Sequence, residues 1–79
     1  MNKATILITG TSDGIGLALA QLYMARGARV FGLGRRPAAE LVPELRSTYC
    51  RVDLAQPFAA ALVADFLRWH GVDQLDMLI

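Results

Sequence analysis

A glycine-rich turn at residues 9–16 lies between an apolar segment and a helical one, and this order constrains the fold more than any other feature of the chain. Residues 4–9 are almost wholly apolar and β-branched, as in a parallel strand that is buried on both faces. Residues 15–26 predict a helix that ends at Gly27. A strand, a glycine turn and a helix in this order direct backbone N–H groups and a helix N-terminus at one place, which suits a pyrophosphate group.

The length and the composition indicate that the chain needs apolar cover from outside itself. Its 79 residues allow at most one small domain, and a domain of this size buries only about 60% of its unfolded surface. Yet 54% of the residues are hydrophobic, and the mean hydropathy is +0.38. We therefore expect either a piece of a larger protein or an oligomer.

The charge and the single cysteine limit the kinds of binding partner and the cellular compartment that we expect for the chain. The net charge is +1, and the basic residues are scattered except for the pair Arg35-Arg36, so we expect no nucleic-acid partner. Cys50 is the single cysteine, which excludes an internal disulfide, offers no metal-ligand spacing and fits a reducing cytoplasm; we expect it to be buried. The apolar stretch after Lys3 is too short for a signal peptide or a membrane span, so no membrane partner is expected.

Strand-like and helix-like segments alternate along the whole chain. The expected strands are residues 4–9, 28–33, 48–52 and 75–79, and the expected helices are residues 15–26, a short piece within 38–46 that Pro43 interrupts, and residues 58–70. This alternation predicts an α/β fold with a parallel sheet and right-handed crossovers. The mixed polarity of residues 48–52 places that strand at a sheet edge.

Two of the helices carry apolar residues that we expect to be buried. Residues 15–26 are apolar nearly all round, which predicts a mostly buried helix. In the last helix Phe58, Leu62, Phe66 and Trp69 line one face, which predicts a core stripe. His70 lies at the end of this helix, where we interpret it as structural.

The glycines of the first turn suit a phosphate ligand but do not by themselves require one. Gly10 lets the chain turn out of the first strand, and Gly14 and Gly16 remove side chains where a pyrophosphate and a neighbouring strand approach. The spacing G-x-x-x-G-x-G differs from the commoner G-x-G-x-x-G, and no Gly-Lys-Ser/Thr follows as in a P-loop. Ser12 either donates its hydroxyl to a phosphate or satisfies the backbone of the turn. A tight turn without a ligand is the alternative interpretation.

Four segments in order resemble the short-chain dehydrogenase/reductase family. Thr9-Gly10-Thr11-Ser12-Asp13-Gly14-Ile15-Gly16 resembles the family's cofactor-binding motif. Gly34-Arg35-Arg36 resembles the loop that meets the adenosine ribose, and Val52-Asp53-Leu54 resembles the segment that meets the adenine. Leu75-Asp76-Met77-Leu78-Ile79 resembles the fourth strand, which in the family leads into an Asn-Asn-Ala-Gly motif. The match spans essentially the whole chain.

The resemblance implies a fold and a set of cofactor-binding residues. It implies a Rossmann-like, three-layer parallel sheet that is partial, with strand order 3-2-1-4, so that residues 1–79 form the N-terminal part of an NAD(P)-binding domain truncated after the fourth strand. The implied cofactor-binding residues are Gly10, Ser12, Asp13, Gly14, Ile15, Gly16, Arg35, Arg36, Asp53 and Leu54.

The residues after the second strand favour NADP as the cofactor. An NAD site usually places an acid there, about 20 residues past the glycine turn, whereas this chain has Gly34. Arg35 and Arg36 follow, and guanidinium groups match a 2′-phosphate, although a solvated loop pair is the alternative. Asp13 would repel that phosphate, so NAD stays possible. Asp53 either binds the adenine amino group or caps the last helix, and Leu54 would contribute its backbone N–H.

The catalytic residues of the family are not found in the chain. The family uses a Tyr and a Lys four residues apart, with a Ser and an Asn, all beyond the fourth strand; the Tyr is the general acid/base. Tyr23 and Tyr49 are followed four residues later by Gly27 and Asp53, and Lys3 is the only lysine. We therefore expect no catalysis by this chain alone.

Two hypotheses about function follow. In the first, the chain is the dinucleotide-binding N-terminal part of an NADP(H)-dependent oxidoreductase acting on a carbonyl or alcohol. In the second, it is a non-catalytic, self-associating module without a cofactor. With strand order 3-2-1-4 the fourth strand is an open apolar edge, and we expect a homodimer that pairs two chains through Leu75 to Ile79.

Overall fold

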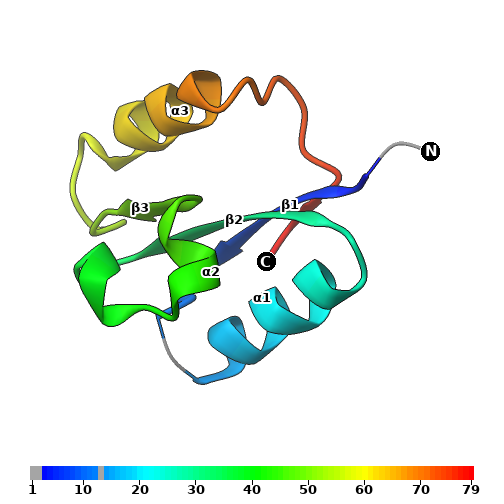
Figure 1. Cartoon of the computed structure of the whole chain (residues 1–79). Coiled ribbons are helices and arrows are strands. Elements are labelled where there is room, and N and C mark those ends of the chain that lie inside the picture. Colours follow the sequence, from blue (N-terminus) through cyan, green and yellow to red (C-terminus); the bar gives the residue numbers. More distant parts are fainter. Residues whose placement is uncertain (1–2, 13) are drawn as a thin grey trace.

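Strands and helices alternate from one end of the chain to the other in the computed structural model, which describes residues 3–12 and 14–79 (Figure 1). The elements in order are β1 (Thr5–Thr9), α1 (Gly14–Ala25), β2 (Arg29–Gly34), the 3₁₀ helix η1 (Ala38–Glu40), α2 (Pro43–Arg46), β3 (Tyr49–Arg51), α3 (Ala59–Trp69) and β4 (Met77–Leu78). The predicted break at Pro43 separates η1 from α2, because a proline is accepted at the first turn of a helix but not inside one.

The strands form one parallel sheet with the order β3-β2-β1-β4, which confirms the predicted topology. β1 and β2 pair from Thr5 opposite Arg29 to Thr9 opposite Leu33. β3 forms one edge, as its mixed polarity predicted. Because all strands run the same way, the loops that follow β1, β2 and β3 meet at one end of the sheet.

Helices cover both faces of the sheet and enclose two apolar cores (Figure 1). Successive side chains of a strand point to opposite faces. Ile6 and Ile8 therefore pack on the side of α1 and α2, and Leu7 packs on the side of α3. Cys50 is buried in the second of these cores, as expected. The predicted three-layer arrangement is confirmed.

β4 is shorter than the five residues predicted for it. Only Met77–Leu78 meets the strand criteria, yet its backbone follows β1 further on both sides. The Asp76 N–H donates to the Thr5 carbonyl at 2.9 Å, and the Ile79 N–H donates to the Leu7 carbonyl at 2.9 Å. The pairing thus extends along most of β1.

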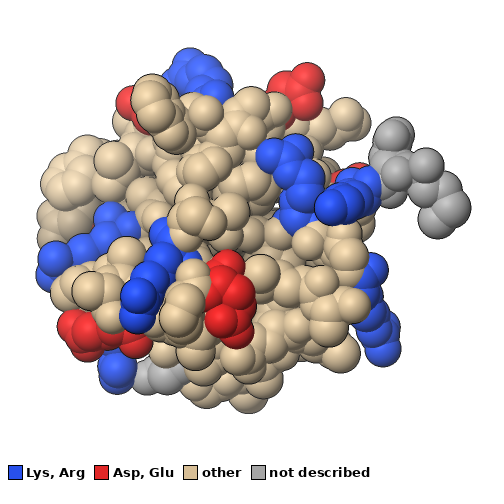
Figure 2. All heavy atoms as spheres, viewed as in Figure 1, with Lys and Arg blue, Asp and Glu red and all other residues tan. Residues whose placement is uncertain are grey.

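The prediction that the first helix is mostly buried is wrong. Ala20 is the buried residue of α1, whereas Ile15 is 81% exposed and Leu22 is 44% exposed. One face of the helix, with Leu17 and Met24, packs on the sheet, and no other described element covers the opposite face. Uncharged side chains accordingly cover the part of the surface where α1 lies (Figure 2).

The predicted core stripe of the last helix is also wrong for three of its four members. Trp69 is 86% exposed, Phe58 is 58% exposed and Leu62 is 39% exposed. The residues that face the sheet are Ala59, Val63, Phe66 and Leu67. Both sets have helical spacing, and the sequence does not show which of two adjacent apolar stripes meets the sheet.

His70 follows α3 and has the structural role that we expected. Its ring packs edge-on against Phe31 and Phe66, with centroid separations of 5.3 and 4.9 Å. Its carbonyl accepts a hydrogen bond from the Arg29 guanidinium at 3.2 Å. The histidine ring therefore extends the aromatic packing of the core between α3 and the sheet.

Candidate functional site

The glycine turn between β1 and α1 has one open side and one closed side. Gly10 and Gly14 adopt positive φ angles of 70° and 61°, and a Cβ added at either would have no atom of another described residue within 4 Å. A side chain at Gly16 would overlap the Gly10 carbonyl oxygen. The turn is fixed to β2 because the Gly10 N–H donates to the Leu33 carbonyl at 2.8 Å. The open side, at the N-terminus of α1, is the side that a phosphate can approach.

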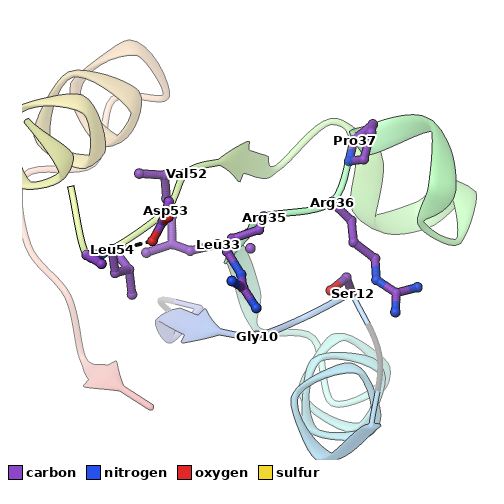
Figure 3. A pocket seen from close by; sticks show the side chains of 11 residues that line it. Gly10, Ser12, Leu33, Arg35, Arg36, Pro37, Val52, Asp53 and Leu54 are labelled. Atoms are coloured by element: carbon purple, nitrogen blue, oxygen red, sulfur yellow. Dashed lines mark hydrogen bonds between the residues drawn. The ribbon is translucent and has the colours of Figure 1, made fainter.

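A surface hollow of about 670 Å³ lies where the loops after β1, β2 and β3 meet. Six of the residues predicted to bind a cofactor line it, namely Gly10, Ser12, Arg35, Arg36, Asp53 and Leu54 (Figure 3). Gly14, Ile15 and Gly16 lie in the first turn of α1 and do not line it. Asp13 lies outside the described residues. The position agrees with the rule that ligands of open α/β sheets bind beyond the carboxyl ends of the strands.

Five further residues line the hollow that were not among the predicted cofactor-binding residues, although Gly34 and Val52 belong to the two segments that resemble the family's ribose and adenine segments. These residues are Leu33, Gly34, Pro37, Val52 and Ala55. Gly34, Pro37, Val52 and Ala55 are each adjacent in sequence to a predicted residue at the end of β2 or β3, and Leu33 lies two residues before Arg35. That adjacency is the signal that could have identified them.

The two arginines lie on one side of the hollow. Arg35 and Arg36 are exposed, and in Figure 3 both side chains point from the end of β2 toward the turn that carries Gly10 and Ser12. Guanidinium groups at the mouth of a hollow attract an anionic ligand.

Asp53 and Leu54 lie across the hollow from the arginines (Figure 3). The Asp53 carboxylate accepts a hydrogen bond from the Ala55 N–H at 3.0 Å, and its carbonyl accepts one from Gln56 N–H at 3.0 Å. This is a local turn and not a helix cap, because α3 begins at Ala59 with Phe58 as its N-cap. The alternative that Asp53 caps the last helix is therefore wrong.

Two groups behind the hollow have shifted proton affinities. Burial raises the pKa of Tyr49 above its ordinary value of 10.0, so the phenol is protonated and can donate a hydrogen bond at neutral pH. Burial also raises the pKa of the Cys50 thiol, which makes it a poor nucleophile. The raised pKa values keep both groups protonated at neutral pH.

These features fit the adenosine-phosphate half of a dinucleotide. Gly10, in the turn before α1, and the cationic side chains that follow β2 line the same hollow. The residues lining the hollow come from the ends of β1, β2 and β3, and none comes from β4. Within residues 3–12 and 14–79 no group of His, Cys, Asp and Glu side chains has the arrangement of a metal site. No helix in the same residues is long and apolar enough to cross a membrane.

Relatives of known sequence resemble the chain over almost all its length. The chain is 35% identical over 75 residues to the short chain dehydrogenase ausX of Emericella nidulans, which is 94% of this chain and 38% of the relative. It is 31% identical over 80 residues to the short chain dehydrogenase ple7 of Rhodocybe pseudopiperita, which is 100% of this chain and 32% of the relative. The chain thus spans about a third of the length of the curated relatives it matches.

Solved structures show the same fold. A short-chain dehydrogenase from Streptomyces avermitilis matches with a TM-score of 0.77 and 29% identity, over 98% of this chain and 29% of that one. The TT0495 protein of Thermus thermophilus matches with a TM-score of 0.74 and 33% identity, over 96% of this chain and 32% of that one. The sequence model of the short chain dehydrogenases matches residues 4–79. The chain therefore belongs to the short chain dehydrogenase family.

Proposed function

We propose that this chain is the dinucleotide-binding N-terminal part of an NADP(H)-dependent oxidoreductase that acts on a carbonyl or alcohol substrate. One observation carries the proposal: the arginine pair after β2 lines the same hollow as the glycine turn after β1. A ligand with a pyrophosphate and a further phosphate on its ribose would bring negative charge to both the glycine turn and the arginine pair. The coenzyme would supply or accept a hydride when bound, and the chain's own residues would hold its adenosine half.

Five of the residues that line the hollow would contact the cofactor in this proposal. Arg35 and Arg36 would bind the 2′-phosphate through charge-assisted hydrogen bonds, and Ser12 would donate its hydroxyl to the pyrophosphate. Asp53 would accept a hydrogen bond from the adenine amino group, with the backbone N–H of Leu54 beside it. The ends of the strands would keep these groups in one hollow.

NAD is the cofactor against which NADP has to be compared. A Brucella ovis oxidoreductase of the short chain dehydrogenase/reductase family, solved in complex with a partially ordered NAD, matches this chain with a TM-score of 0.73 and 29% identity, over 98% of this chain and 37% of that one. In our proposal the lack of a carboxylate at Gly34 and the charge of Arg35 and Arg36 favour NADP instead.

We do not propose that the chain catalyses hydride transfer by itself. Neither of its tyrosines, Tyr23 and Tyr49, has a lysine four residues later. Tyr49 is 8% exposed, and its hydroxyl donates to a backbone carbonyl. Turnover by the pure chain would contradict this part of the proposal. A cytoplasmic location also belongs to the proposal, supported by the one free cysteine, Cys50.

Calorimetric titration at low salt tests the cofactor preference. We expect NADPH to bind at least about tenfold more tightly than NADH, since charge-assisted hydrogen bonds contribute about 1.5–3 kcal/mol each. The double variant Arg35→Ala/Arg36→Ala should remove this difference and leave NADH binding unchanged. The matched control changes two arginines outside the hollow to Ala: Arg26, which directly follows α1, and Arg68, which lies on α3. Equal binding of the two cofactors, or none, would contradict the proposal.

A second candidate function is self-association through the open edge of the sheet. β4 pairs with β1 on one side, and Met77, Leu78 and Ile79 are 42%, 66% and 39% exposed. An unpaired apolar edge is a template for a second chain, and we propose that two chains pair here about a two-fold axis. Sedimentation of the wild type and of Leu78→Lys tests this. A dimer that the lysine dissociates supports the candidate, and a wild-type monomer at high concentration overturns it.

A further inference from the structure

Two side chains of the edge strand β3 hold the backbone of the arginine pair. The Tyr49 hydroxyl donates a hydrogen bond to the Arg36 carbonyl at 2.7 Å. The Arg51 Nε donates one to the Arg35 carbonyl at 2.9 Å. Tyr49 and Arg51 are two residues apart and thus on the same face of the strand. Both carbonyls of the pair are therefore anchored to β3.

Gly34, directly before the pair, lies close to the hydroxyl end of the Tyr49 side chain. A Cβ built on Gly34 would lie 2.6 Å from the Tyr49 hydroxyl oxygen, 3.2 Å from Cε1 and 3.4 Å from Cζ. Gly34 is not among the glycines with positive φ, so its backbone conformation is open to any residue. A glycine is needed at position 34 because the Tyr49 side chain leaves no room for a Cβ, and not because of the backbone conformation.

The tyrosine cannot move away from Gly34 at small cost. Tyr49 is 8% exposed and belongs to the same apolar core as Ile8, Leu41 and Leu45, beside α1 and α2. Turning the ring aside would also break the hydrogen bond to the Arg36 carbonyl. A side chain at position 34 therefore has to displace a packed and bonded group.

We infer that Tyr49 is a specificity-determining positioning residue for the cofactor. Its hydroxyl occupies the space in which a side chain at position 34 would begin, and so excludes the carboxylate that would bind a ribose 2′-hydroxyl at this position. The same hydroxyl holds the Arg36 backbone, so that the arginine pair faces the hollow. The inference rests on the proposed function, and Tyr49 acts through Gly34 and Arg36 without lining the hollow itself.

A double-mutant cycle on thermal stability tests the contact without any cofactor. We expect Gly34→Ala to lower the Tm by roughly 5–10 °C in the wild type, because the new methyl group meets the hydroxyl oxygen. In the Tyr49→Phe background the nearest atoms are ring carbons at 3.2 and 3.4 Å, and we expect less than about half that loss. Equal losses in the two backgrounds would overturn the inference.

Titration of the folded variants with NADPH and NADH tests the effect on specificity. We expect Tyr49→Phe to weaken NADPH binding by about fivefold, the equivalent of one hydrogen bond, and to leave NADH binding unchanged. Tyr23→Phe is the matched control, because this second tyrosine lies on α1 outside the hollow. Equal weakening of both cofactors, or no effect on either, would overturn the assignment. If the wild type binds neither cofactor, the proposed function fails, whereas the stability cycle still decides whether Tyr49 excludes a side chain at position 34.

Discussion

The loop after β1 and the end of β2 both form the hollow, but they are shaped in different ways. The first loop turns on its own glycines, with positive φ at Gly10 and Gly14 and a close backbone approach at Gly16. The end of β2 has glycines at 32 and 34 because side chains from elsewhere occupy the space above them. A glycine can therefore be required by the backbone or by a distant neighbour, and the two requirements are tested differently.

One side chain connects the two regions. Thr11 belongs to the first loop, is fully buried, and lies where a side chain at Gly32 would begin. Its hydroxyl oxygen has no hydrogen-bond partner among the described residues. The glycine turn is thus docked on β2 by the packing of Thr11 as well as by its backbone hydrogen bonds to the Leu33 carbonyl.

The largest expected effect is at Gly16, inside the first loop. Gly16→Ala should destabilise the chain by at least about 3 kcal/mol, because the methyl group would overlap a backbone carbonyl that cannot turn aside. Gly14→Ala is the matched control: it meets open space and should cost only the roughly 1–2 kcal/mol of a positive φ. Urea unfolding of both variants measures the difference. If the two variants lost the same free energy of unfolding, the turn would not have an open and a closed side.

A smaller effect is expected at Gly32, where the two regions meet. Gly32→Ala should cost about 2 kcal/mol, since the methyl group would overlap the Thr11 side chain. Thr11→Ala should relieve much of that cost when combined with it, because the threonine supplies all three nearest atoms. A double-mutant cycle in urea measures the coupling. Additive costs would show that Thr11 does not require the glycine.

The pH dependence of stability tests the contribution of Tyr49 at the end of β2. Because burial raises the pKa of Tyr49 above 10.0, the protonated phenol is favoured in the folded chain. Its contribution is fully present below pH 10.0 and is lost as the pH rises through the raised pKa. The Tm difference between the wild type and Tyr49→Phe should therefore narrow above about pH 10 in a series of melting curves. A difference that stays constant up to about pH 11 would contradict this.

The smallest expected effect is at Thr11 itself. Thr11→Val keeps the shape of the side chain and removes a buried hydroxyl that has no partner among the described residues. We expect a change between zero and a gain of about 1 kcal/mol in the free energy of unfolding. A clear loss of stability in urea unfolding would show that the hydroxyl has a partner in solution.

Much of the fold followed from local patterns in the sequence. The β-branched run before the glycine turn predicted β1, and Gly27 ended α1 as expected. Six of the predicted site residues meet in one hollow, because they follow parallel strands whose carboxyl ends lie together. The buried face of α3 was mispredicted, since Phe58, Leu62 and Trp69 offered an apolar stripe next to the one that packs on the sheet.

The order of the elements, the parallel sheet and the glycine turn could be predicted from local sequence patterns, because they depend on side-chain periodicity and on backbone freedom over a few residues. Two features are visible in the folded chain alone: Thr11 and Tyr49 occupy the space beside Gly32 and Gly34, and β3 side chains hold the backbone of the arginine pair. The physical reason is that such contacts depend on which distant side chains share a volume. The pattern of apolar and polar residues along the chain does not show which distant side chains will be in contact.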